Sequence, residues 1–178
     1  MASQRFPHSM QPFGPQDVRP TYAADPLRTL GTEQRQEIAD YLNATAYNDL
    51  VVDSIIRMYD HRNALVLYFS DHGEEVHYFR KQYGRTDLSE DAAPQALRLQ
   101  LDVPFMVYAT PAYRKQHPEV CRRLADAVTR RFMTDDLPHL LFDLLGVGTR
   151  YYSPQRSVIN ERYVPPTHRR LQNGRLYD

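Results

Sequence analysis

Apolar side chains recur at helical spacing between about residues 33 and 59, which predicts one long helix. The recurring positions are Ile38, Leu42, Thr45, Val52, Ile55, Ile56 and Tyr59. Thr32 can cap the start of this helix, and the carboxylate of Glu33 suits the positive end of the helix dipole. Only Asn48 and Asp49 interrupt the apolar side, so we expect the helix to be continuous.

Two continuous apolar runs, residues 64–69 and 103–109, predict two strands. Each run is bounded by polar residues, as expected of a strand that is buried on both faces. Pro104 is tolerated because it stands near the start of its strand. Strands that alternate with helical segments are typical of an α/β fold. We therefore expect the two strands to be neighbours or near-neighbours in one sheet, with the 33–59 helix packed on a face.

The carboxyl-terminal third predicts two more helices and a turn. Apolar positions at helical spacing run from near Pro118 to Phe132, and a second pattern runs from Asp136 to Gly146, a natural helix stop. The Asn173-Gly174 pair is typical of a tight hairpin turn.

The first thirty residues differ from the rest of the chain in composition. They are rich in Pro, Gln and Ser, and their prolines exclude regular helix or central strand. We expect residues 1–30 to form an irregular segment and residues 31–178 to form the folded part, and we expect an upstream segment to be missing.

The composition argues against several kinds of partner and chemistry. The 178 residues carry 22 basic and 22 acidic side chains, so no net charge draws the chain to nucleic acid. No apolar run approaches the roughly 20 residues that span a bilayer, and residues 1–7 lack the apolar region that a signal peptide contains. Cys121 is the only cysteine, which excludes an internal disulfide and a thiolate zinc cluster.

The strongest chemical signal is Ser70-Asp-His-Gly73, directly after the first predicted strand. Ligands of open α/β sheets bind beyond the carboxyl ends of strands. A carboxylate oxygen and a neutral imidazole nitrogen suit zinc or another divalent metal. Gly73 permits a turn that swings Asp71 and His72 toward one point. The same residues could instead form a capped turn in which His72 pairs with Asp71.

The segments around this motif carry a resemblance to a known family. They are residues 47–56, 64–75, 83–85, 103–113 and the closing 173–178. Together, in this order, they resemble the carboxyl-terminal half of the membrane phosphoethanolamine transferases, which belong to the sulfatase and alkaline phosphatase superfamily. The resemblance runs from about residue 30 to the end of the chain.

The resemblance implies a three-layer α/β sandwich with a central, mainly parallel or mixed sheet that is incomplete at its amino-terminal side. It also implies zinc-dependent transfer of phosphoethanolamine from phosphatidylethanolamine to lipid A or a lipopolysaccharide core sugar. That reaction takes place at the periplasmic face of the bacterial inner membrane. Asp71 and His72 match the zinc ligands of the family.

The chain also departs from the family pattern. The nucleophilic threonine and an acidic zinc ligand of the family lie upstream of the matching region, so no threonine here inherits the nucleophile's role. Where the family has a further histidine, this chain offers Asp87 as an oxygen ligand or Arg85 as a phosphate contact, and a solvated loop is the competing interpretation. His8 is the counterpart we consider for a phosphoryl-contacting histidine.

Two other histidines have structural interpretations. His77 is expected to be a loop or surface residue and His117 a residue at a helix start.

Three functional hypotheses therefore stand. The first is the metal-bearing part of a phosphoethanolamine transferase that is inactive by itself. The second is another hydrolase of the superfamily, a sulfatase or phosphodiesterase. The third is a degenerate domain without catalysis, so whether this chain is an enzyme stays open.

Overall fold

The computed structural model describes residues 12–19, 29–79, 83–85, 94–171 and 174–177. The predicted sites at His8 and Asp87 lie outside these residues. The described residues group into two compact units. Unit 1 takes its residues from 1–58 and 67–106, and unit 2 from 59–66 and 107–178. The boundary predicted near residue 30 remains a prediction.

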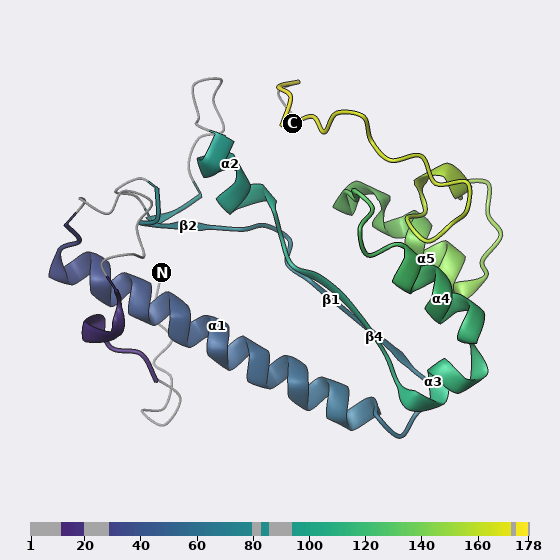
Figure 1. Cartoon of the computed structure of the whole chain (residues 1–178), viewed down its shortest axis with the longest axis horizontal. Helices are drawn as coiled ribbons and strands as arrows, with labels where there is room; N and C mark the ends of the chain where they lie inside the picture. Colours follow the sequence, from purple (N-terminus) through teal and green to yellow (C-terminus); the bar gives the residue numbers. More distant parts are fainter. Residues whose placement is uncertain (1–11, 20–28, 80–82, 86–93, 172–173, 178) are drawn as a thin grey trace. The chain divides into compact units, whose positions relative to one another are not determined.

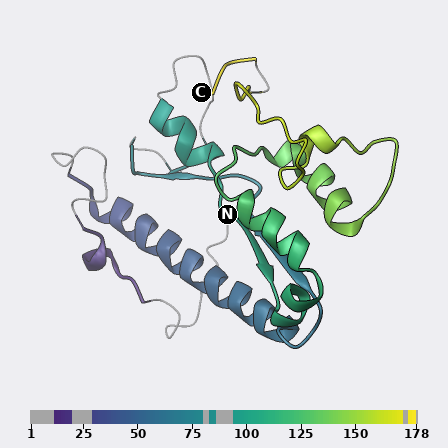
Figure 2. The ribbon, with the colours of Figure 1, turned by 45° about the vertical axis from the view of Figure 1, so that its right-hand side comes forward.

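Helix α1, Thr32–Tyr59, is the longest element of the chain and belongs to unit 1 up to Met58. It is continuous in both ribbon views, which confirms the expected long helix (Figures 1 and 2). Its amino-terminal half is well covered, because Ile38 and Ala39 are fully buried against Val18, Leu30 and Val76. The small core of unit 1 therefore lies at the start of α1.

The described part of the irregular segment, residues 12–19, packs on this half of α1. It contains only the short 3₁₀ turn η2, Pro15–Asp17. Buried Asn43 binds its backbone twice, accepting from the Phe13 nitrogen at 3.0 Å and donating to the Phe13 oxygen at 2.9 Å. Arg35 donates to the Val18 carbonyl oxygen at 3.0 Å. These bonds satisfy an extended backbone that has no strand partner.

Strands β1, Leu65–Phe69, and β4, Phe105–Ala109, pair with one another as predicted. Within unit 1 the Ser70 nitrogen donates to the Pro104 oxygen, and within unit 2 the Thr110 nitrogen donates to the Ala64 oxygen. Opposite ends of the strands thus meet, so the pair is antiparallel.

The expectation that both strands are buried on both faces is wrong. Every residue of β4 is only half-buried, and so is β1 except for Phe69, which is 39% exposed. Each strand has one neighbour in the described sheet, which leaves much of its apolar surface open.

Unit 1 also contains three elements that the sequence did not predict. Strands β2, Glu75–Val76, and β3, Tyr83–Gly84, form an antiparallel pair, and α2, Pro94–Leu101, follows. Two-residue strands are too short to produce an alternating pattern. They are recognisable only from the pairing itself.

Unit 2 contains α3, Pro111–Gln116, α4, Pro118–Asp126, and α5, Leu137–Leu145, with 3₁₀ turns η4, Thr134–Asp136, and η5, Pro154–Arg156. His117 stands directly before α4, as predicted. Gly146 ends α5 in the left-handed conformation with φ of 63°, also as predicted.

Helix α4 is shorter than its apolar pattern predicts. The backbone N–H groups of Ala127, Val128 and Arg130 each donate to a carbonyl three residues back, which tightens the chain into turns. Val128, which the pattern placed on the apolar face, is 82% exposed.

Asn173 of the expected turn lies outside the described residues, and the chain is described on either side of it, up to Leu171 and from Gly174. The Arg170–Leu176 bridge is antiparallel, and Gly174 has φ of 85°.

A hydrogen-bonded carboxylate organises unit 2. Four side chains donate to the partly buried carboxylate of Asp143: Arg123 at 2.9 Å, Tyr152 at 3.0 Å, Ser157 at 2.8 Å and Asn160 at 2.9 Å. Burial acts to raise the pKa of Asp143, but these hydrogen bonds outweigh it, so the pKa lies below its usual value. Asp143 therefore links α4, α5 and the loop after η5.

In the described part of the chain, no helix is both long and apolar enough to cross a membrane.

We expect Asp143→Asn to lower the free energy of unfolding by about 2–4 kcal/mol, because it removes the charge that strengthens four hydrogen bonds at a partly buried site. Because the folded pKa is lowered, the stabilisation is complete above the unfolded pKa of about 3.9 and is lost as the pH falls through the folded pKa. Urea unfolding followed by circular dichroism between pH 7 and pH 3 measures both effects.

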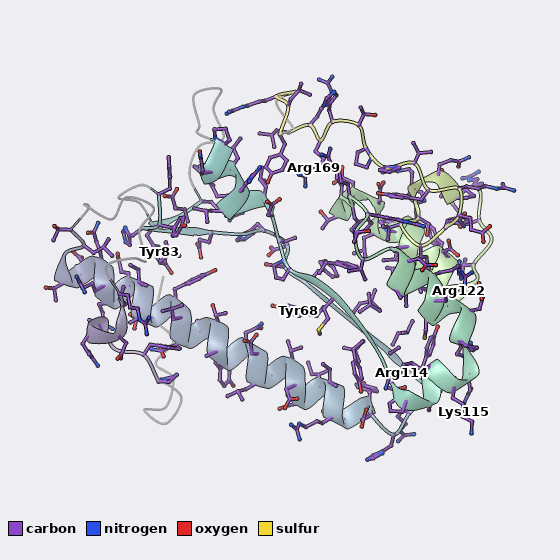
Figure 3. The ribbon with its side chains drawn as sticks, viewed as in Figure 1. Tyr68, Tyr83, Arg114, Lys115, Arg122 and Arg169 are labelled. Atoms are coloured by element: carbon purple, nitrogen blue, oxygen red, sulfur yellow. The ribbon has the colours of Figure 1, made fainter. Side chains whose placement is uncertain are left out.

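Asp126→Asn is the matched control, since Asp126 pairs with Arg122 at 3.0 Å on the exposed side of α4 (Arg122 is labelled in Figure 3). It should cost less than about 1 kcal/mol. Equal losses in the two variants would show that Asp143 does not organise the unit.

Candidate metal centre

The Ser70-Asp-His-Gly73 segment leaves the sheet at the carboxyl end of β1. The last ladder bond joins the Ser70 nitrogen to the Pro104 oxygen at 3.4 Å. The Ser70 hydroxyl then donates to the His72 carbonyl oxygen at 2.7 Å and closes a tight turn. Asp71 thus stands immediately after the strand, as predicted.

The hydrogen bonds of this turn fix the chemistry of both side chains. His72 Nδ1 lies 2.9 Å from the Gly73 carbonyl oxygen. A carbonyl only accepts, so Nδ1 carries the proton and Nε2 keeps a free lone pair. One oxygen of Asp71, Oδ1, accepts from the His72 backbone nitrogen at 3.0 Å. Nε2 is therefore the ring nitrogen of His72 that remains available to a metal.

The two free donor atoms face one another. His72 Nε2 lies 3.7 Å from Asp71 Oδ2, which is too long for a hydrogen bond. Two atoms that both lie about 2.0–2.2 Å from one zinc ion are at most about 4.4 Å apart. The observed separation therefore lets a single ion contact both atoms.

The pair is open to solvent and supplies two ligands. The Asp71 side chain is 85% exposed and that of His72 is 36% exposed. Among the residues that the structure describes, no group of three or more His, Cys, Asp or Glu side chains could hold a metal ion. By themselves, Asp71 and His72 could hold only a largely water-coordinated metal.

Gly73 holds the motif against α2. Its nitrogen donates to the Gln100 oxygen at 2.8 Å. A Cβ atom at this position would lie 2.2 Å from the Leu99 carbonyl oxygen, which is backbone and cannot move aside as a flexible side chain would. The motif needs glycine here because the backbones of two segments touch.

The remaining predicted site residues do not join this pair within the described chain. Arg85 is exposed directly after β3 and makes no hydrogen bond or ion pair with Asp71 or His72 there. The proposed roles of His8, Arg85 and Asp87 remain predictions.

The surface interpretation of His77 is wrong. Its side chain is buried, and Nε2 lies 2.5 Å from Glu37 Oε2 of α1. His77 has φ of 56°, an uncommon conformation for a residue with a side chain. Neighbouring Glu75 is fully buried, and its Oε1 accepts from the Phe79 nitrogen at 3.0 Å. No local pattern predicts this polar cluster, because Glu37 is 40 residues away from His77 in the chain.

The fold and the motif define a class of protein. An α/β arrangement in which a strand ends in Asp-His-Gly is the pattern of the sulfatase and alkaline phosphatase group. The sequence model of the Sulfatase family matches residues 2–147. The chain therefore belongs to the sulfatase family.

The similar curated proteins are phosphoethanolamine transferases. The chain is 34% identical over 140 residues to phosphoethanolamine transferase EptC of Escherichia coli K12, covering 78% of this chain and 23% of EptC. It is 34% identical over 105 residues to CptA of Salmonella typhimurium LT2, covering 59% of this chain and 17% of CptA. It is 26% identical over 163 residues to EptA of E. coli K12, covering 87% of this chain and 27% of EptA. The chain thus spans about a quarter of the length of EptC and EptA.

Solved structures support the same fold. The crystal structure of the carboxyl-terminal periplasmic domain of EptC from E. coli matches with a TM-score of 0.76 at 29% identity, covering 94% of this chain and 44% of the domain. The zinc complex of that domain matches with a TM-score of 0.75 at 30% identity, covering 93% and 43%. The expected sulfatase-like α/β fold and the resemblance are both confirmed.

We expect Gly73→Ala to lower the free energy of unfolding by about 1–3 kcal/mol, because the new methyl group overlaps the Leu99 carbonyl. The control is Gly148→Ala, since a Cβ there meets nothing within 4 Å. Chemical unfolding of both variants gives the comparison. A Gly73→Ala protein as stable as Gly148→Ala would show that the close approach does not constrain the motif.

Proposed function

We propose that this chain is the metal-bearing carboxyl-terminal part of a phosphoethanolamine transferase. The proposal rests on the distance of 3.7 Å between His72 Nε2 and Asp71 Oδ2, which one metal ion could bridge. His72 Nδ1 is hydrogen-bonded to the Gly73 carbonyl oxygen, so it is not available to the metal. The zinc complex of the similar EptC domain supports zinc as the metal. Identity of 34% to EptC supports phosphoethanolamine as the transferred group.

Asp71 and His72 would hold the zinc ion at the end of β1. When bound, such an ion activates a nucleophile and neutralises charge on phosphoryl oxygens. The chain's own contribution is positional: the Ser70 hydroxyl closes the turn, and Gly73 holds it against α2. The hydrogen bond from His72 Nδ1 to the Gly73 oxygen leaves Nε2 as the ring nitrogen that would bind the ion.

The resemblance to phosphoethanolamine transferases suggests a donor, an acceptor and a location for the reaction. Phosphatidylethanolamine is the donor we propose, and lipid A or a lipopolysaccharide core sugar is the acceptor. The reaction would take place at the periplasmic face of the bacterial inner membrane. The match to a periplasmic domain of EptC supports this location.

Catalysis needs more than this chain contributes. The described residues supply two ligands, and the chain spans about a quarter of EptC. We therefore assign the nucleophile and a further acidic ligand to the part of the fold that this chain does not cover. Asp87 is proposed as an additional oxygen ligand, with Arg85 and His8 as phosphoryl contacts.

His72→Ala and Asp71→Ala should each weaken zinc binding about tenfold or more, because each removes one of two protein ligands. Stability should change by less than about 1 kcal/mol, since the motif is partly exposed at a strand end. Isothermal titration with zinc, paired with thermal unfolding, measures both quantities. His61→Ala, an exposed histidine outside the site, is the control and should leave zinc binding unchanged. Unchanged affinity in the Asp71 and His72 variants would reject the site.

The purified chain with zinc should not release phosphoethanolamine from a lipid or chromogenic donor above the rate of zinc alone. The reason is that a transferred group needs a nucleophile held against the metal. Mass spectrometry of the donor reaction detects release at low levels. Turnover that Asp71→Ala abolishes would show that the chain carries its own nucleophile. Turnover of a sulfate ester alone would favour the sulfatase alternative.

A further inference from the structure

Three carboxylates lie around Tyr83 in unit 1 (Tyr83 is labelled in Figure 3). Glu37 and Asp40 are three residues apart on α1, so they share one side of the helix. Glu74 directly precedes β2, and its Oε1 would lie 3.6 Å from a Cβ atom at Gly84, the residue after Tyr83 in β3. Burial raises the pKa of the Tyr83 hydroxyl, and negative charge on Glu74, Glu37 and Asp40 raises it further. We call these three carboxylates and Tyr83 the acidic group.

The acidic group has no Lys or Arg partner within the described chain, where none of its carboxylates forms an ion pair with either residue type. Asp40 accepts from the uncharged amide of Gln36 at 2.9 Å. Glu37 contacts the His77 ring at 2.5 Å. Like charges that lie near one another without a counter-charge repel, so the group attracts a positively charged ligand.

A buried nitrogen beside the acidic group also lacks a partner. The His77 side chain is only 6% exposed, and its ring lies next to that of Tyr83, with the centroids 6.2 Å apart. A carboxylate only accepts, so Nε2 donates to Glu37 and, in the neutral ring, Nδ1 is an acceptor. Nδ1 has no hydrogen-bond partner among the described residues. A buried acceptor without a donor costs free energy, so a donor is missing at this place.

The placement of the carboxylates argues against a metal ion as the ligand. Within the described ranges, no three His, Cys, Asp or Glu side chains are placed to hold one. The negative charge is instead spread over α1 and the start of β2, with the half-exposed ring of Tyr83 among the carboxylates. A ligand that fits this pattern has several positive charges, each with N–H donors, separated by apolar segments.

Linear aliphatic polyamines have this chemistry. Their ammonium groups form charge-assisted hydrogen bonds with carboxylates. An ammonium group is also attracted to the face of a tyrosine ring, and the methylene groups between the charges can pack on that ring.

We propose that the acidic group, with buried His77 beside it, binds a linear aliphatic polyamine. The inference goes beyond the proposed function, because none of the residues involved is a proposed zinc ligand and no transfer reaction is needed. Binding depends on charge, so it weakens as the salt concentration rises.

The test adds spermidine to the zinc-free 178-residue chain and follows the backbone amides by two-dimensional NMR. We expect a Kd of about 1 mM or tighter at low salt, with the largest shifts at Asp40, Tyr83 and Gly84. Putrescine should bind more weakly than spermidine, because it carries one charge fewer. Butanediol, the neutral analogue of putrescine, and magnesium chloride are the controls and should leave these amides unshifted. Because zinc is absent, the result is independent of zinc binding at Asp71 and His72.

Glu37→Gln and Asp40→Asn should each weaken spermidine binding about fivefold or more, since each removes one charge and keeps the shape of the side chain. The amide oxygen of Gln at position 37 can still accept from His77, which preserves that contact. Asp49→Asn is the matched control, because Asp49 is an exposed carboxylate on another side of α1, and it should leave Kd unchanged. Circular dichroism checks that α1 is kept. For a variant that does not fold, the shifts of the wild-type chain decide.

Four results would overturn the proposal. The first is the absence of spermidine-induced shifts at Asp40, Tyr83 and Gly84. The second is an equal effect of magnesium, since the group would then be a general acidic surface. The third is binding of butanediol as tight as that of putrescine, since the contact would then be apolar. The fourth is the same Kd for Glu37→Gln, Asp40→Asn and Asp49→Asn.

Discussion

Backbone hydrogen bonds at the end of β1 are the constraint on which the candidate site depends. Ser70 bonds to Pro104 and Gly73 bonds to Gln100, so the four residues of the motif are held between the neighbouring strand and α2. This leaves room for no side chain at position 73, and it turns the next carbonyl toward His72 Nδ1. Main-chain packing thus sets the geometry of the proposed metal ligand His72.

The half-exposure of β1 and β4, whose residues are divided between the two units, has a physical cause. A central strand of an α/β sheet is stabilised by a neighbour on each edge and a helix layer on each face. Here β1 and β4 have only each other in the described sheet, and their side chains stay half-exposed. The chain corresponds to 44% of the related periplasmic domain.

Unit 2 is stabilised in a different way. Its central interaction is polar: one carboxylate, Asp143, accepts from four side chains drawn from α4 and the loops after α5. Because all four side chains donate to this one carboxylate, they hold the irregular loops in place without a sheet. In unit 1, apolar contacts at the start of α1 hold the irregular segment in place.

The sequence by itself determined the elements whose signal is local. The helical spacing of apolar residues predicted α1 and α5, and continuous apolar runs predicted β1 and β4. The order of the motifs indicated the family. It also placed Asp71 and His72 beyond a strand end. These features depend on residues close together in the chain, so spacing alone reveals them.

Tertiary structure decided what depends on residues far apart. Burial of His77 requires Glu37, and the antiparallel direction of β1 and β4 depends on which ends meet. The early end of α4 and the half-exposure of both strands also departed from the pattern. Apolar composition states how much burial a segment can use, but only the neighbours that are present determine how much it receives.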